Sequence, residues 1–205
     1  MKSGRLYVLS GPSGSGKGTI CKRLISQTDA ALSVSMTTRA PRPTETEGVS
    51  YFFVSDEAFE KVVGEGGLLE YAEVYGRRYG TPKAPVLAHL EAGRDVILEI
   101  DIQGAMQVKR NYPEGVFVFI LPPSMAELER RIKSRGADSE EQVRLRLGQA
   151  LREMDWIREY DYYIINDDLD TAVAEAMAVM RAEGRKVDAG AVALIEKYRK
   201  EAEKG

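Results

Sequence analysis

A glycine-rich segment at residues 11–19, GPSGSGKGT, restricts the possible folds of this chain more than any other part of its sequence. The apolar stretch RLYVLS at 5–10 precedes it and predicts a strand, and residues 17–27 follow with the spacing of a helix. Glycines let the backbone wrap around phosphate oxygens with its N–H groups pointing inward, and a helix N-terminus adds partial positive charge. The pattern Gly-x-x-x-x-Gly-Lys between a strand and a helix therefore predicts a P-loop. A glycine-rich turn that binds no ligand is the alternative.

The residues of this loop form the first group of candidate binding residues. The group consists of Gly11, Pro12, Ser13, Gly14, Ser15, Gly16, Lys17, Gly18 and Thr19. Lys17 would place a positive charge on the β- and γ-phosphates of a nucleotide. Gly18 stands where a P-loop usually carries a Ser or Thr whose hydroxyl binds Mg²⁺, so we expect Mg²⁺ to be held mainly through water and nucleotide oxygens. Gly18 and the lack of an Asn-Lys-x-Asp motif also argue against a GTPase switch protein.

The order of the apolar stretches predicts the fold class. Residues 95–100, 115–121 and 160–165 are almost continuously apolar, which is typical of strands buried on both faces. Helical stretches or insertions separate them, and this alternation predicts an α/β fold with a parallel sheet flanked by helices.

Two segments depart from this alternation. Residues 35–81 combine short alternating strands with turn residues and predict a small β-rich insertion. Residues 124–158 are helical and highly charged, and their second half has one apolar stripe. The stripe consists of Val143, Leu147, Ala150, Leu151, Met154 and Ile157. Residues from about 187 to 205 predict a terminal helix to which we assign no function.

The composition excludes several classes of protein. The formal net charge is −3, which gives no basic field for a nucleic-acid partner. No apolar run approaches the roughly 18 residues that a membrane-spanning helix needs, so we expect no membrane partner. Cys21 is the single cysteine and cannot form an intramolecular disulfide, which favours a reducing cytoplasm. The single histidine, His89, excludes a site with several histidine ligands.

The insertion contains residue types that suit a phosphate and a purine base. Arg39 and Arg42 lie three positions apart among prolines, and arginine binds phosphate as a planar fork. Tyr51 and Tyr79 could add neutral hydroxyl donors. A proline-rich surface loop with two solvated arginines is the alternative.

Glu70 is flanked by apolar residues in the stretch LLEYA, where a buried carboxylate needs a partner. Guanine offers one, because its N1–H and its 2-amino group are two adjacent donors that adenine lacks. A carboxylate opposite them could select guanine, since a mismatched base would leave the charge unpaired.

Asp101 ends the apolar run VILEID, at the edge of a sheet where α/β proteins build their sites. Glu99, two residues earlier, points to the same face. Either carboxylate could approach Mg²⁺ while the other approaches a base, and a simple cap at the strand end is the alternative.

Three arginines of the charged segment are candidates for contact with a transferring phosphate. Arg131 and Arg135 are one helical turn apart and share a face, and Arg146 borders the apolar stripe. Solvated helix charges are the alternative for each of them.

Together these segments closely resemble the guanylate kinase family, in the family's order over about residues 5–170. The matching pieces are LSGPSGSGKGT, SVSMTTRAPRPTETEGVSYFFVS, LLEYAEVYGRRYGTP, VILEIDIQGA, RIKSRGADSEEQVRLRL and YDYYIINDD. The resemblance implies transfer of the γ-phosphoryl group of ATP to GMP, with Mg²⁺ present and dGMP as a further substrate. It implies a P-loop core, a GMP-binding insertion and a lid. These parts would cover residues 1–34, 82–123 and 159–205 for the core, 35–81 for the insertion and 124–158 for the lid.

The resemblance also assigns roles to single residues. It implies that Ser35, Glu70, Thr81 and Asp101 read the guanine, that Arg39, Arg42, Tyr51 and Tyr79 hold its phosphate, and that Glu45 supports them. It places Arg131, Arg135 and Arg146 on the phosphates during transfer and Asn166 near the adenine of ATP.

Two other functions compete with this interpretation. One is a kinase for another nucleoside monophosphate, against which Glu70 and Ser35 argue. The other is a non-catalytic guanylate-kinase-like binding module, but such modules have usually lost the lysine or glycines that this loop keeps. No oligomeric state is predicted.

Overall fold

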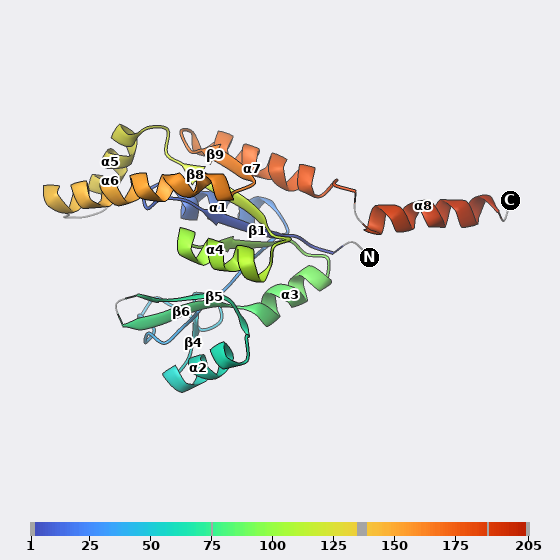
Figure 1. Ribbon diagram of the computed structural model, residues 1–205, viewed down its shortest axis with the longest axis horizontal. Coiled ribbons are helices and arrows are strands. Elements are labelled where there is room, and N and C mark those ends of the chain that lie inside the picture. The colour runs from blue at the N-terminus through green and yellow to red at the C-terminus, as the bar shows by residue number, and fades with distance from the viewer. Residues whose placement is uncertain (1–2, 75, 135–138, 188, 204–205) are drawn as a thin grey trace.

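The computed structural model describes residues 3–74, 76–134, 139–187 and 189–203. Its centre is a five-stranded sheet in the order β2-β7-β1-β8-β9, in which every neighbouring pair is parallel (Figure 1). The strands are β1 (Leu6–Ser10), β2 (Ala31–Leu32), β7 (Val96–Glu99), β8 (Val116–Leu121) and β9 (Tyr162–Ile165). The predicted fold class is therefore confirmed.

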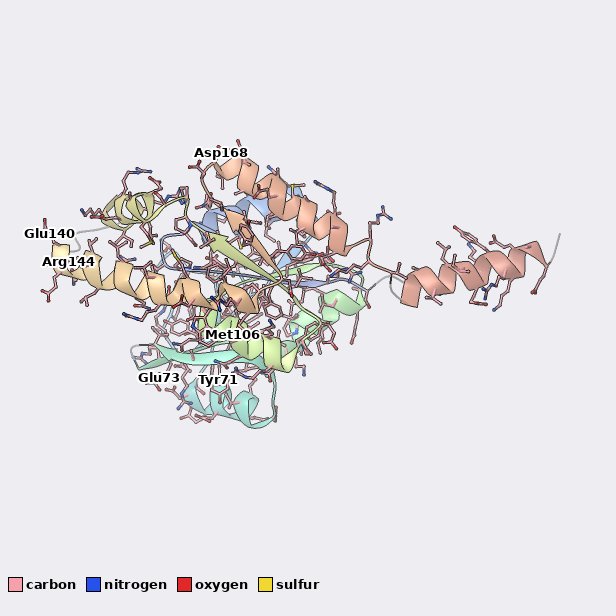
Figure 2. All side chains as sticks on the ribbon, turned by 45° about the horizontal axis from the view of Figure 1, so that its top comes forward. Tyr71, Glu73, Met106, Glu140, Arg144 and Asp168 are labelled. Carbon is pink, nitrogen blue, oxygen red and sulfur yellow. The ribbon has the colours of Figure 1, made fainter. Side chains whose placement is uncertain are left out.

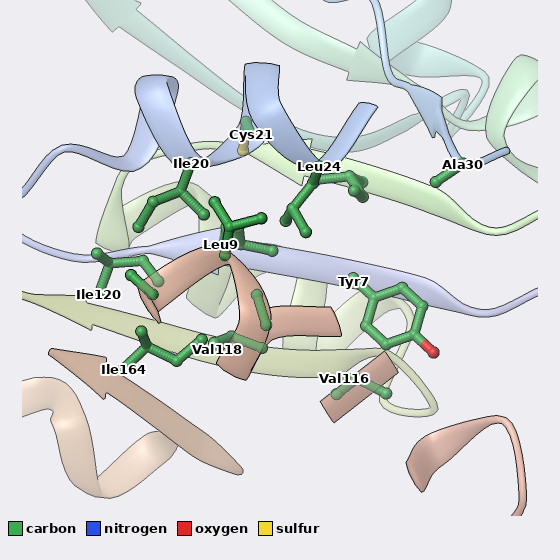
Figure 3. Packing of buried hydrophobic residues seen from close by; sticks show 14 residues of the cluster. Tyr7, Leu9, Ile20, Cys21, Leu24, Ala30, Val116, Val118, Ile120 and Ile164 are labelled. Carbon is green, nitrogen blue, oxygen red and sulfur yellow. The ribbon is translucent and has the colours of Figure 1, made fainter. Parts of the chain in front are cut away.

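Side chains that alternate along β1 hold helices against both faces of this sheet. Tyr7 and Leu9 belong to a buried cluster with α1 (Lys17–Gln27) and α7 (Leu169–Glu183). Figure 3 shows Ile20 and Leu24 of α1 in that cluster beside Leu9. Leu6 and Val8 point the other way, into a second cluster with α3 (Lys83–Glu91) and α4 (Ile102–Asn111). Because β1 is buried on both faces, the loop that follows it starts from a fixed position.

The described residues between 35 and 82 contain a second, four-stranded sheet in the order β4-β3-β6-β5. Its strands are β3 (Met36–Thr37), β4 (Phe52–Phe53), β5 (Leu68–Val74) and β6 (Arg77–Pro82). The segment also contains a helix that the sequence analysis missed, α2 (Asp56–Gly64), which begins at Ser55 with the Ser55 hydroxyl accepting the Ala58 N–H.

Helix α4 joins the second sheet to the core. The Gln107 side chain accepts the backbone N–H of Tyr71 and donates to its carbonyl, so it binds β5 as a strand would. The Asn111 amide donates to the Leu69 carbonyl at 2.8 Å. These contacts fix β5 along the side of α4, and α4 begins shortly after the carboxyl end of β7.

The charged segment, residues 124–158, contains α5 (Met125–Ser134), α6 (Glu140–Met154) and a 3-10 helix, η1 (Asp155–Glu159). Ser139 and Gln142 form the capping box that starts α6. Leu128 and Ile132 of α5 pack on Val143 and Ala150 of α6 in a small core of their own. Leu151 was predicted to join the stripe but is 53% exposed, because it lies at the edge of the stripe.

The last described helix, α8 (Ala189–Ala202), extends away from the rest of the molecule in Figure 1. None of the helices in the described ranges has both the length and the apolar character needed to cross a membrane.

Candidate active site

At three positions the loop between β1 and α1 has a backbone conformation that residues other than glycine rarely adopt. Gly11, Gly14 and Gly16 have φ angles of 143°, 93° and 94°. A Cβ on Gly11 would lie 2.2 Å from the Ile120 carbonyl oxygen, and one on Gly16 would lie 2.1 Å from the Asn166 amide nitrogen. The glycines that predicted the P-loop are therefore needed for its conformation as well as for the close approach of the neighbouring chain.

Lys17 lies inside the curve of the loop. Its ammonium donates to the Gly11 carbonyl at 2.6 Å and to the Pro12 carbonyl at 3.3 Å. Burial lowers the pKa of Lys17, and the carboxylates of Glu99 and Glu153 oppose that shift. The loop thus holds a desolvated cation, which attracts a phosphate more strongly than a solvated one would.

A cavity of about 520 Å³ opens in front of this cation. The loop forms one wall, with Thr19 and Lys22 of α1 beside it, and Gln149 and Glu153 of α6 contribute to the wall as well. Neither α6 residue was predicted. Their one signal in the sequence is a separation of one helical turn, which many pairs of surface residues share.

Gly18 brings the backbone of α1 against a carboxylate. A Cβ on Gly18 would lie 3.1 Å from one Glu99 carboxylate oxygen and 3.3 Å from the other. Glu99 therefore occupies the space beside the position where a hydroxyl side chain would stand. Among the residues described, no group of three His, Cys, Asp or Glu side chains is arranged to hold a metal ion by itself.

Glu70 is a buried carboxylate on β5 that faces the first turn of α4. It is 8% exposed, and its Oε1 accepts the Thr81 hydroxyl from the neighbouring strand at 2.6 Å. Burial raises the pKa of Glu70 above its ordinary value, Thr81 opposes this shift and the nearby Asp101 carboxylate adds to it.

Asp101 lies opposite Glu70, at the start of α4. Its Oδ1 accepts the Gly104 N–H at 2.7 Å, so it caps the helix as the alternative interpretation of this residue foresaw. It also lines the cavity of the P-loop. Capping the helix and facing the cavity are compatible, because a carboxylate has two oxygens and the cap uses one.

Arginine and tyrosine side chains gather on the second sheet. The Arg39 guanidinium donates to Glu45 at 2.8 Å, and its Cζ lies 5.5 Å from the centroid of the Tyr51 ring. The Arg42 N–H donates to the other Glu45 oxygen. The bond from Arg39 and, to a smaller extent, the bond from Arg42 lower the pKa of Glu45. The Tyr51 and Tyr79 rings meet edge to face at 6.0 Å. Ser35 lies at the head of β3, where its carbonyl accepts the Phe52 N–H.

The charged segment touches the P-loop at three points. The Leu128 side chain of α5 lies 2.7 Å from where a Cβ of Gly14 would stand. The Arg146 guanidinium donates to the Ser13 hydroxyl at 3.0 Å. Arg131 donates to the Ser15 carbonyl at 3.5 Å and to the Asn166 carbonyl at 2.9 Å, and the Asn166 amide donates to the Ser15 carbonyl at 2.8 Å. Arg135 lies outside the described residues.

Two further cavities lie nearby. A cavity of about 240 Å³ on the far side of the loop is lined by residues that include Arg131, Ser134 and Asn166. A larger one of about 680 Å³ lies between α4 and the end of α6, where Met106 and Trp156 line it. Figure 2 labels Met106 in this region and shows Arg144 near the outer end of α6.

The chain is similar to known proteins over most of its length. Residues 3–183 match the family model described as guanylate kinase. A guanylate kinase of Caldanaerobacter subterraneus subsp. tengcongensis is 54% identical over 188 residues, 91% of each chain, and one of Clostridioides difficile is 48% identical over 202 residues, 98% of each. The crystal structure of guanylate kinase from Anaplasma phagocytophilum gives a TM-score of 0.72 at 34% identity, with 91% of this chain and 89% of that chain covered.

The chain belongs to the guanylate kinase family. The family model ends at residue 183, the last residue of α7, so α8 lies beyond the residues that the model matches.

We predict that Gly16→Ala weakens ATP binding by at least about tenfold, because the new methyl group collides with Asn166 and pushes it off the Ser15 carbonyl. Gly66→Ala is the matched control. Gly66 also has a positive φ, 64°, but no atom lies within 4 Å of its Cβ position, so this variant should lose only about 1 kcal/mol of stability and bind ATP normally. Calorimetric titration and thermal unfolding measure both effects, and normal ATP affinity in Gly16→Ala would contradict the role of the loop.

Proposed function

We propose that this chain transfers the γ-phosphoryl group of ATP to GMP and releases ADP and GDP. The observation that carries the proposal is that a P-loop and a buried carboxylate lie close together. Asp101 lines the same cavity as the P-loop, and the buried Glu70 lies beside Asp101. Membership in the guanylate kinase family supports the same reaction. No observation favours a binding module or a kinase for another nucleoside monophosphate.

Recognition of GMP would begin at the base. Glu70 and Asp101 would accept the N1–H and the 2-amino group of guanine, with Thr81 and Ser35 as hydroxyl partners. The bond from Thr81 leaves Oε2 of Glu70 available for a base. Adenine lacks this pair of donors, so its binding would leave a buried charge unpaired.

The phosphate of GMP would lie against Arg39, Arg42, Tyr51 and Tyr79. Glu45 already holds the Arg39 guanidinium and the Arg42 backbone in place. An arginine that is ordered before binding loses less side-chain entropy when a phosphate binds. Glu45 would therefore support phosphate binding by holding Arg39, without contacting the phosphate itself.

The attacking oxygen of GMP is ionised at neutral pH, so the transfer needs no general base. Catalysis would then come from alignment and from neutralising charge. Lys17 and the loop N–H groups would hold the β- and γ-phosphates, while Arg131, Arg135 and Arg146 would approach the transferring group. Arg146 and Arg131 already contact the loop region through Ser13 and Asn166.

Mg²⁺ would supply positive charge between the phosphates of ATP. Mg²⁺ usually keeps several of its waters and takes only one or two carboxylates from the protein. The carboxylates of Glu99 and Asp101 in this cavity are consistent with that type of coordination. Gly18 offers no hydroxyl, and Glu99 stands beside it. We therefore assign Glu99, and not Asp101, to the waters of Mg²⁺. The adenine of ATP would occupy the cavity of about 240 Å³ that Asn166 lines.

A panel of acceptors tests the reaction. ADP release is measured with ATP and with GMP, dGMP, AMP, UMP, CMP or dTMP, each with Mg²⁺ and again with excess EDTA. We expect turnover with GMP and dGMP and its loss in EDTA. Turnover with AMP would remove the base-reading role from Glu70, and no turnover with any acceptor would favour a binding module.

We also propose that residues 1–34, 82–123 and 159–205 act as the core, 35–81 as the GMP-binding part and 124–158 as a lid.

Trp156, the single tryptophan, is 49% exposed at the base of the charged segment and lines the cavity beside α4. We predict that its emission shifts to shorter wavelength when GMP and a non-hydrolysable ATP analogue bind together, because closure removes water from the indole. Unchanged emission and an unchanged radius in small-angle scattering would contradict closure.

We predict that Glu70→Gln raises the KM for GMP by about tenfold to a hundredfold, since a buried hydrogen bond to a charged group contributes roughly 1.5–3 kcal/mol. The KM for ATP should change little. Glu73→Gln, an exposed carboxylate on the same strand, is the matched control and should behave like the parent.

The same pair of variants gives a pH test. Because burial raises the pKa of Glu70, the bound base loses its carboxylate partner as the pH falls through that raised value. The affinity for GMP should therefore fall at a higher pH than for an ordinary glutamate, and this component should vanish in Glu70→Gln. The phosphate of GMP titrates in every variant alike, so the ratio of the profiles isolates Glu70. Identical profiles in all three proteins would exclude Glu70 from base reading.

We further propose a cytoplasmic location, which the free and buried Cys21 supports. Cell fractionation tests it.

A further inference from the structure

Helix α4 carries a glycine in its first turn that its backbone does not require. Gly104 is buried and lies three residues after the capping residue Asp101, to which it donates its N–H. It does not belong to the glycines with positive φ. Alanine is favoured over glycine inside a helix, so helix formation alone would select another residue here.

The carboxylates of Glu70 and Asp101, which form the proposed guanine site, lie beside Gly104. A Cβ on Gly104 would lie 3.1 Å from Oε2 of Glu70 and 3.4 Å from its carboxyl carbon. It would also lie 3.4 Å from Oδ1 of Asp101. Outside the backbone of the helix itself, these are the three nearest heavy atoms, so a side chain at this position would meet the two carboxylates first.

Glu70 has little freedom to yield to a methyl group. The Thr81 hydroxyl holds its Oε1 at 2.6 Å, and the side chain is almost fully buried on β5. A displacement of a few tenths of an ångström would therefore act on Oε2, the oxygen that remains for a base.

We propose that Gly104 is a positioning residue for guanine recognition. The missing side chain lets Glu70 and Asp101 approach each other over the first turn of α4, and this spacing sets the preference for a purine with a 2-amino group. The inference rests on the proposed function and adds to it a residue that determines specificity without contacting the substrate.

Gly104→Ala tests the proposal against Gly64→Ala. Gly64 is also helical, in α2, and no atom lies within 4 Å of its Cβ position. Thermal unfolding and steady-state kinetics are measured with ATP and with GMP or IMP, an acceptor that lacks the 2-amino group. Glu70→Gln is measured in parallel.

For Gly104→Ala we expect an unchanged or higher melting temperature, an unchanged KM for ATP and a fall of about tenfold in kcat/KM for GMP. The ratio of kcat/KM for GMP to that for IMP should also fall, because IMP makes fewer bonds to the displaced carboxylates. Gly64→Ala should leave all kinetic values unchanged. Gly104→Ser, with one atom more, should show a larger loss of the same kind.

Two results would overturn the proposal. Normal kcat/KM for GMP in Gly104→Ala, together with a large loss in Glu70→Gln, would show that the glycine does not position the carboxylates. A lower melting temperature with equal losses for ATP, GMP and IMP would assign Gly104 a structural role only. A normal GMP affinity in Glu70→Gln would instead contradict the proposed reading of guanine itself.

Discussion

The bond from the Lys17 ammonium to the Gly11 carbonyl is the contact around which the rest of the site is arranged. It holds a cation inside a loop whose glycines take φ angles that other residues rarely adopt. Burial lowers the pKa of this cation, and the carboxylate of Glu99 opposes the shift most strongly. The charge of Lys17 in the loop is thus partly offset by carboxylates from the end of β7 and from α6. A phosphate chain with its counterion would add further charges to the same site.

Three separate segments of the chain lie against the same loop. Asn166 follows β9 and donates to the Ser15 carbonyl, while Leu128 of α5 packs beside Gly14. Arg146 of α6 reaches Ser13. Because these contacts come from the core and from the charged segment, a change in the position of either one reaches the loop directly.

The strongest local signals predicted the fold well. The helix after the loop was expected at 17–27 and is Lys17–Gln27, and the predicted strands lie within two residues of their expected bounds. The expected burial on both faces was wrong for β9, because it is an edge strand whose Tyr163 and Ile165 are exposed. Strand β2 has only two residues, too short for any periodic pattern, and α2 was hidden inside a segment dominated by turn residues. Within the site, apolar neighbours predicted the burial of Glu70. Gly104 gave no signal, because its importance depends on two carboxylates that only the folded chain brings beside it.

The most direct test of the account is Lys17→Ala, measured for turnover and for GMP binding separately. We expect kcat to fall by about a thousandfold, since the loss of a buried charge at the transferring group costs several kcal/mol and roughly 1.4 kcal/mol corresponds to a factor of ten. GMP affinity, measured by calorimetry, should stay within about twofold of the parent, because Lys17 lies on the loop side of the cavity and Glu70 on the second sheet. Turnover close to that of the parent, or equal losses in turnover and GMP binding, would contradict the central role of this lysine.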